Sequence, residues 1–153
     1  MKAAWDKFGE NDKFMAMGGD AEAIVDGQPG AFNLEKAEEL GLNSTLCFPM
    51  AELNKIDEAA SLVHGMLANN FTAGAYHVTD VANAEDLVAA IDEEMKNTKW
   101  LCGVPEMKMI MTVNEEYVVS MFGSTDILNM FKEKFAEAYG DNFVVLVEEA
   151  ITE

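Results

Sequence analysis

The sequence has no arginine and little positive charge of any kind. Its 153 residues include 28 acidic residues against ten lysines, which gives a formal net charge of −18. Arginine has the planar guanidinium that binds phosphate in two places at once, and a strongly negative field repels polyanions. The composition therefore excludes nucleic acid as an expected partner.

Long apolar runs are also missing. No run approaches the roughly 18 residues that a membrane-spanning helix needs, and the first residues lack the apolar stretch of a signal peptide. Half of the residues are apolar and a quarter are charged, which is typical of a globular domain. We expect residues 1–153 to form a single soluble domain.

Cysteine is scarce. Cys47 and Cys102 stand 55 positions apart, which excludes CxxC redox motifs and zinc ribbons. In an exported protein the two could form a structural disulfide, whereas in the cytosol both would pack as small apolar side chains. A nucleophilic Cys102 is a third interpretation, and it requires a neighbouring base.

The spacing of apolar residues predicts where the helices and strands lie. Residues 1–50 are rich in glycine and should be mostly loop, with short helices near residues 1–8 and 34–40, the second capped by Asn33. Apolar residues at helical intervals predict a helix over residues 51–70. Beyond it we expect a strand over 71–80, a helix capped by Asn83, a hairpin of strands 108–113 and 117–122, a helix from Ser124 to Gly140, and a buried strand over 143–147.

This order of elements from residue 71 to 151 matches the split βαββαβ arrangement of ferredoxin-like domains. The predicted fold class is therefore α+β, a ferredoxin-like sandwich of a four-stranded antiparallel sheet with two helices on one face. The helix over 51–70 and the N-terminal segment would cover part of the other face or an edge.

No motif for catalysis or cofactor binding is complete in this sequence. His64 and His77 lack a metal-ligand spacing, and GxSxG, HExxH and phosphate-binding glycine motifs are absent. Met107, Met109 and Met111 alternate along one strand, which suits either Cu(I) or core packing, and packing is the favoured interpretation. We therefore predict no catalytic residues, no cofactor and no resident metal.

A small-ligand or metal site is the alternative that the residues leave open. The cleft between the N-terminal layer and the sheet is its predicted place, because aromatic side chains beside soft and titratable groups line such pockets. The candidate residues for this site are Tyr76, His77, Trp100, Cys102 and Met109.

Several short stretches of the second half resemble a known group of proteins. They are WLCGVP at 100–105, YVVSMFG at 117–123, residues 131–139 and EEAI at 148–151. Over residues 45–151 the chain resembles uncharacterised small lipoproteins of Gram-positive gut bacteria that carry a domain of unknown function. That resemblance implies an envelope or extracellular protein held to the membrane only through a lipid anchor, although the signal sequence and anchoring cysteine of that group are not in this chain.

Two functional hypotheses follow. The first is a non-enzymatic cell-envelope module that binds an unknown protein or small ligand, with a homodimer as its nearest form, because a small domain often covers an exposed sheet edge with a second copy. The second is the small-ligand or metal-binding domain with a pocket near Trp100 and Cys102. A hydrolase ranks below both, because no polar cluster is apparent in the sequence.

Overall fold

The computed structural model describes residues 1–101 and 103–152. Its helices are α1 (Lys2–Trp5), α2 (Leu42–Leu46), α3 (Ala84–Lys96) and α4 (Thr125–Tyr139). Its strands are β1 (Ala16–Gly18), β2 (Val25–Asp26), β3 (Gly30–Phe32), β4 (Ile56–His64), β5 (Phe71–Val78), β6 (Met107–Val113), β7 (Tyr117–Gly123) and β8 (Phe143–Ala150). Short 3₁₀ helices lie between these elements at Leu34–Lys36, Met50–Lys55, Ala68–Asn70, Val81–Asn83 and Gly140–Asn142.

The strands form one eight-stranded antiparallel sheet, so the predicted ferredoxin-like fold with its four-stranded sheet is wrong. The order across the sheet is β2-β1-β4-β5-β7-β6-β8, and β3 pairs with β4 beside β1. Among the described residues, no helix is long and apolar enough to cross a membrane.

The helix predicted over residues 51–70 is the main error. This segment forms a 3₁₀ turn, then strand β4, then a second 3₁₀ turn. Strand β4 is buried on both faces: Ala59 contacts one core of the protein and Leu62 contacts the other. A strand with two buried faces has no apolar and polar alternation, and its alanines favour helix, so the local pattern resembles a helical period.

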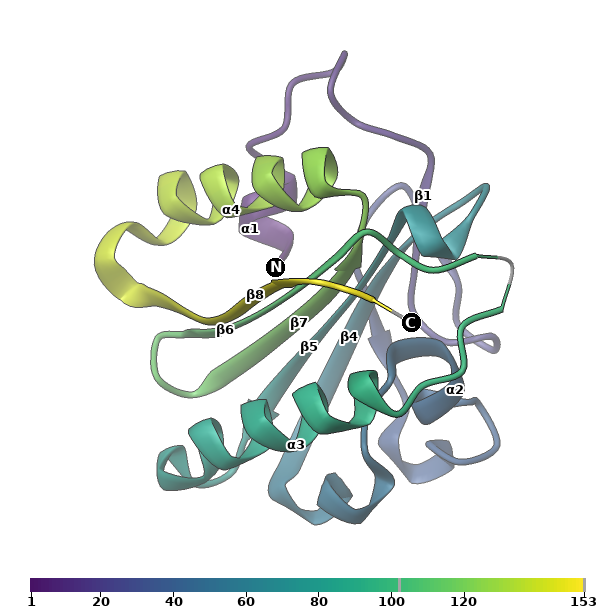
Figure 1. The fold of residues 1–153 in the computed structure, drawn as a ribbon, viewed down its shortest axis with the longest axis vertical. Coiled ribbons are helices and arrows are strands. Elements are labelled where there is room, and N and C mark those ends of the chain that lie inside the picture. The colour runs from purple at the N-terminus through teal and green to yellow at the C-terminus, as the bar shows by residue number, and fades with distance from the viewer. Residues whose placement is uncertain (102, 153) are drawn as a thin grey trace.

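The two long helices lie on opposite faces of the sheet, not on one face as predicted (Figure 1). Strand β4 occupies the edge of β5 that the last strand takes in a ferredoxin-like sheet, and β8 pairs with β6 instead. The crossovers β5-α3-β6 and β7-α4-β8 then step across the sheet in the same direction, but they start from antiparallel strands. Since such crossovers are almost always right-handed, their helices must lie on opposite faces.

Each face of the sheet therefore has its own apolar core. On one face α3 and α2 pack over the sheet, with Tyr76, Ile110 and Phe122 among the buried side chains. On the other face α4 and α1 pack together, and Trp5 stacks on Phe131 with ring centroids 5.9 Å apart. The central strands are buried between the two helical layers.

Several local predictions are confirmed. Ser124 Oγ accepts a hydrogen bond from the Ile127 amide and starts α4, which ends at Gly140. The Asn33 side chain caps the turn that follows it. Strands β6 and β7 pair as an antiparallel hairpin. By contrast, Asn83 precedes α3 without a side-chain cap hydrogen bond.

The last strand differs from its prediction as a buried strand. Strand β8 is the edge strand beyond β6, and Val144 and Leu146 on it are exposed. Its apolar run FVVLV suggested two covered faces, but an edge position leaves alternate side chains in solvent. Sequence periodicity does not distinguish these two environments.

One buried ion pair links α3 to the sheet. Lys108 on β6 is 4% exposed, and its Nζ lies 2.6 Å from Asp92 Oδ1, while Lys96 lies 3.2 Å from the other carboxylate oxygen. Partial burial alone would raise the pKa of Asp92. The hydrogen bonds and charges of the two lysines outweigh that effect, so the pKa of Asp92 is lowered overall. Burial makes this pair sensitive to the loss of either partner.

We predict that K108M destabilises the protein by about 1–3 kcal/mol, because the methionine keeps the packing of the stem but removes a charged hydrogen-bond donor. Urea unfolding monitored by circular dichroism measures the change. K99M, at an exposed lysine, is the control and should change stability by less than about 0.5 kcal/mol. Equal stability of K108M and wild type would contradict a stabilising role for the Lys108–Asp92 ion pair.

Candidate functional site

The structure does not bring the sequence-predicted site residues together. Tyr76 and Met109 are completely buried on opposite faces of the sheet. Trp100 is half-buried, packs edge-to-face on Phe122 at 4.9 Å, and lines a cavity of about 470 Å³ beside the end of α3. His77 lines a different cavity, and Cys102 lies outside the described residues.

Two of the reactive side chains considered from sequence are held in the core. Burial raises the pKa of the Tyr76 hydroxyl and of the Cys47 thiol, so both stay protonated near neutral pH. Thr98 Oγ1 lies 3.7 Å from Cys47 Sγ. The proposed disulfide between Cys47 and Cys102 stays a prediction, because one partner is outside the described residues.

The His77 cavity, of about 570 Å³, lies between the N-terminal segment and the sheet. Ala60 on β4 and Ala75 on β5 form part of its floor, and Phe32 and Leu34 form part of its wall. The buried carboxylate of Asp20 holds this wall in place by accepting hydrogen bonds from the Asn33 and Glu22 amides at 2.8 and 2.9 Å. The small alanines leave the space open because no long side chain fills the sheet face there.

A β-bulge places two carboxylates at one end of this cavity. Ile56 pairs with Val78 and Glu58 pairs with His77, so Asp57 is the extra residue on β4. A bulge redirects a side chain out of the regular alternation, and both Asp57 and Glu58 line the cavity beside His77. Bulges recur next to binding and catalytic sites for this reason.

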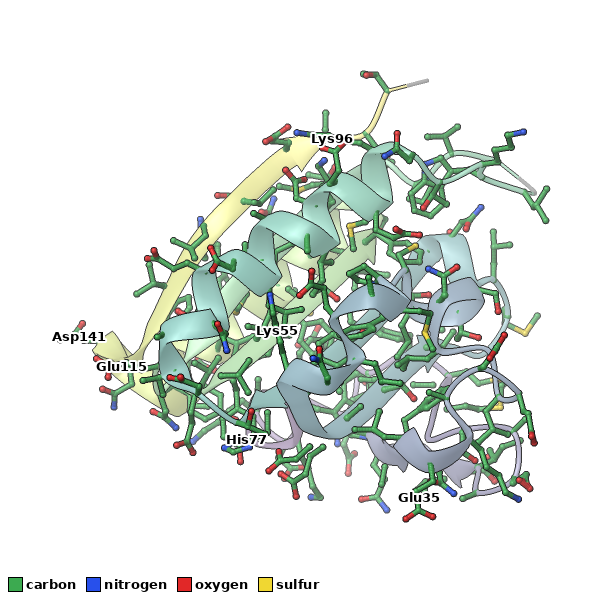
Figure 2. All side chains as sticks on the ribbon, turned by 90° about the horizontal axis from the view of Figure 1, so that it is seen from below. Glu35, Lys55, His77, Lys96, Glu115 and Asp141 are labelled. Atoms are coloured by element: carbon green, nitrogen blue, oxygen red, sulfur yellow. The ribbon has the colours of Figure 1, made fainter. Side chains whose placement is uncertain are left out.

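His77 sits among carboxylates and one aromatic ring. Its Nδ1 donates a hydrogen bond to Asp57 Oδ1 at 2.6 Å, and its Nε2 lies 3.9 Å from Glu116 Oε1. The ring of Tyr117 packs edge-to-face on the imidazole, with centroids 5.0 Å apart. Figure 2 shows His77 at the same end of the sheet as Glu115 and Asp141, while Lys96 lies at the opposite end.

Three carboxylates lie around His77 at this end, and Met1 and Lys2 also line the cavity. The hydrogen bond with Asp57 raises the pKa of His77, and the charges of Asp57, Glu116 and Glu58 add to that effect. Desolvation raises the pKa of Tyr117, and the same three carboxylates raise it further. Within the described residues, Glu58 has no ion-pair partner, so the negative charge is balanced only in part.

Asp57, Glu58 and His77 also form a group that could hold a metal ion. One ligand atom from each lies within 4.8 Å of the others. Imidazole nitrogen and carboxylate oxygen are ligands for Zn²⁺ and other first-row divalent ions. To bind, an ion would displace the proton that His77 shares with Asp57.

Sequence reasoning named His77 but missed Asp57, Glu58, Glu116 and Tyr117. With residues 51–70 assigned to a helix, nothing placed Asp57 and Glu58 next to His77. The signal that could have found them is the pairing of two strands across the turn at residues 65–70, which sets Glu58 opposite His77. A contact of this kind depends on register and not on spacing along the chain.

We predict that D57N lowers the pKa of His77 toward its ordinary value of about 6.5. In the wild type the pKa is raised, so the stability that His77 contributes is fully present below about pH 6.5. That contribution is lost as pH rises through the folded-state pKa. The difference in the free energy of unfolding between the wild type and D57N should therefore decrease as pH rises from about 6.5 through the folded-state pKa of His77. Urea unfolding from pH 5 to 9 measures this difference.

A titration of the His77 ring by NMR checks the pKa directly. D86N, which neutralises a carboxylate in the first turn of α3, is the matched control and should leave the His77 titration unchanged. An unchanged titration in D57N would show that the carboxylate does not set the protonation of His77.

No protein family, curated protein or solved structure matches this chain. The resemblance to small lipoproteins, the envelope location and the homodimer therefore stay predictions from sequence. Function has to be inferred from the His77 cavity.

Proposed function

We propose that this protein is a non-enzymatic binding module that holds a small organic cation in the His77 cavity. The observation that carries the proposal is the pairing of an apolar floor with Asp57 and Glu58, which line the cavity beside His77, and with Glu116, whose Oε1 lies 3.9 Å from His77 Nε2. Such a site suits a ligand with an apolar body and a positively charged amine.

The shape of the cavity supports a ligand larger than a single ion. Its volume of about 570 Å³ falls within the range of small-molecule sites, which are concave, largely apolar and oriented by a few polar groups. Leu34, Ala60 and Ala75 supply apolar surface for the body of the ligand. The carboxylates lie at one end and would fix its direction.

The charge of the site supports a cation. His77 is shared between Asp57 and Glu116, and Glu58 has no ion-pair partner among the described residues, so a bound amine would supply a further counterion and gain charge-assisted hydrogen bonds. The ring of Tyr117 also lines the cavity and offers a face for a cation–π contact. The net charge of −18 attracts cations to the protein from a distance.

We propose binding and not catalysis because neither Cys47 nor Tyr76, the potential nucleophiles considered above, is accessible to a ligand in the cavity. Cys47 and Tyr76 do not line the cavity; they are buried in the core that includes α2 and α3, where burial raises the pKa of each side chain. A nucleophile needs an adjacent base and access to substrate, and neither side chain has that access.

A divalent metal ion is the second candidate ligand, because Asp57, Glu58 and His77 form a group with metal-ligating atoms close together. A metal ion needs an unprotonated His77 nitrogen and would not require the apolar floor. The two candidates therefore differ in their response to apolar probes.

We predict that phenethylamine binds the protein and raises its melting temperature, whereas 2-phenylethanol, which has the same ring without the charge, does not. E58Q should weaken phenethylamine about tenfold, because it removes one charge-assisted hydrogen bond. E85Q, on the exposed face of α3, is the control and should bind like wild type. Isothermal titration calorimetry measures the affinities.

The affinity for phenethylamine should rise with pH as His77 loses its proton, because the imidazolium competes for the same carboxylates. Titration with ZnCl₂ alone separates the two candidates. Zinc binding that H77A abolishes, without phenethylamine binding, would replace the organic cation with a metal ion. Failure of both probes would contradict a cation site in this cavity.

A further inference from the structure

The end of the sheet opposite the His77 cavity has an unusual composition. Three segments that reach this end lack acidic residues, residues 13–19, 59–79 and 95–105; the second is the longest acid-free stretch of the protein and also runs back along β4 and β5 to the cavity. In a chain with 28 acidic residues this is a strong local depletion. Lys13, Lys96 and Lys99 are the lysines of these stretches.

Strand pairing brings parts of the three stretches to the same end of the sheet. Ala16 pairs with His64, so residue 15 lies beside the end of β4, and the Gly65 amide donates to the Met15 carbonyl at 2.7 Å. Residues 65–70 connect β4 to β5 at this end. Asn69 Nδ2 donates to the carbonyls of Leu101 and Gly103, which fixes the third segment beside the second.

Four large apolar side chains project from these loops into solvent. We call them the apolar tip: Met15, Met66, Leu67 and Leu101, which are 66%, 77%, 42% and 80% exposed. Each of these side chains can remove roughly 100 Å² of apolar surface from water when it is buried. Together the four could bury on the order of 400 Å². The largest apolar patch on a monomeric protein is commonly of this size, and such a patch is often functional.

The loops that present the tip are held by specific contacts. His64 Nδ1 accepts hydrogen bonds from the Met66 and Leu67 amides at 3.1 and 3.2 Å, and the ring of Phe14 stacks on His64 at 5.1 Å. These contacts tie the 65–67 turn to the N-terminal segment. The tip side chains therefore project from an ordered framework.

We propose that the apolar tip inserts into the surface of a lipid bilayer. The tip consists of separate side chains at the ends of loops, a shape that suits a deformable medium. Its area is about half of the roughly 800 Å² per partner that a stable protein dimer buries. The three segments that carry the tip have no acidic residues of their own, which favours their approach to a bilayer that the rest of the protein, with its net charge of −18, would avoid.

The proposal also sets the orientation of the His77 cavity. Strand β4 runs from Asp57 and Glu58 at the cavity to His64 at the tip, and nine residues of strand span about 26 Å. With the tip in the bilayer, the cavity faces the aqueous side. Figure 1 shows the loops that flank β1 and follow β4 at one end of the sheet, with the β6–β7 turn at the other.

Flotation with vesicles of phosphatidylcholine tests the proposal. We expect the wild type to float with these vesicles and expect M66S and L101S each to weaken partitioning about tenfold, since each removes one inserted side chain. V81S is the matched control: Val81 is 56% exposed but follows β5 at the cavity end, so its loss should leave flotation unchanged.

Salt dependence and fluorescence separate insertion from charge-driven adsorption. With phosphatidylglycerol in the vesicles, binding should weaken at low salt and recover as salt screens the repulsion. Brominated phosphatidylcholine should quench the half-buried Trp100 beside Leu101, whereas Trp5 is buried in the core, and W100F should lose the quenching.

Three results would overturn the proposal. They are no flotation of the wild type with either vesicle, equal loss of flotation in V81S and L101S, and a wild-type dimer by light scattering that L101S converts to a monomer without any vesicle binding. The last result would assign the tip to contact between copies of the chain. None of these outcomes depends on whether phenethylamine binds the His77 cavity.

Discussion

The pairing of β4 with β5 is the contact on which the rest of this structure depends. It fills the edge of β5, and the last strand, β8, pairs with β6 at the other side of the sheet. With both crossovers right-handed, α3 and α4 then cover opposite faces, and the central strands are buried on both sides. The same pairing places Glu58 opposite His77, so one strand contact determines both the layering of the fold and the composition of its cavity.

Charge is distributed unevenly between the two ends of the sheet. Asp57, Glu58 and Glu116 surround His77 at one end, where the hydrogen bond with Asp57 raises the pKa of His77 and desolvation raises the pKa of Tyr117, and the three carboxylate charges add to both effects. At the other end the loops carry exposed methionine and leucine side chains without acidic neighbours in their own segments. This difference links the two proposals, because a molecule whose apolar tip lies in a bilayer presents its charged cavity to solvent.

Small side chains matter as much as charged ones at the cavity. The short side chains of Ala60 and Ala75 leave space between the sheet and the N-terminal segment. The buried Asp20 carboxylate holds that segment by accepting a hydrogen bond from the Asn33 amide. The bulge at Asp57 then turns an additional carboxylate toward the space. The cavity thus results from missing side-chain volume combined with a local irregularity in one strand.

The sequence by itself determined the elements with strong local signals. The caps at Ser124 and Asn33, the stop at Gly140 and the hairpin of β6 and β7 each depend on residues that are close along the chain. Alternation along β5 likewise sets Ala73 and Ala75 on the face opposite to Tyr76. These features depend on local hydrogen bonding and backbone conformation, which a short stretch of sequence specifies.

Only the tertiary structure decided the identity of β4, the faces that the helices cover and the neighbours of His77. An alanine-rich segment that is buried on both faces has the composition of a helix, and it becomes a strand because its backbone groups pair with β5. Strand β8 likewise has the apolar run of a buried strand but lies at an edge. The cavity residues come from β3, β4, β5 and β7, which are distant in sequence, and register between strands is fixed by packing across the sheet and not by any one segment.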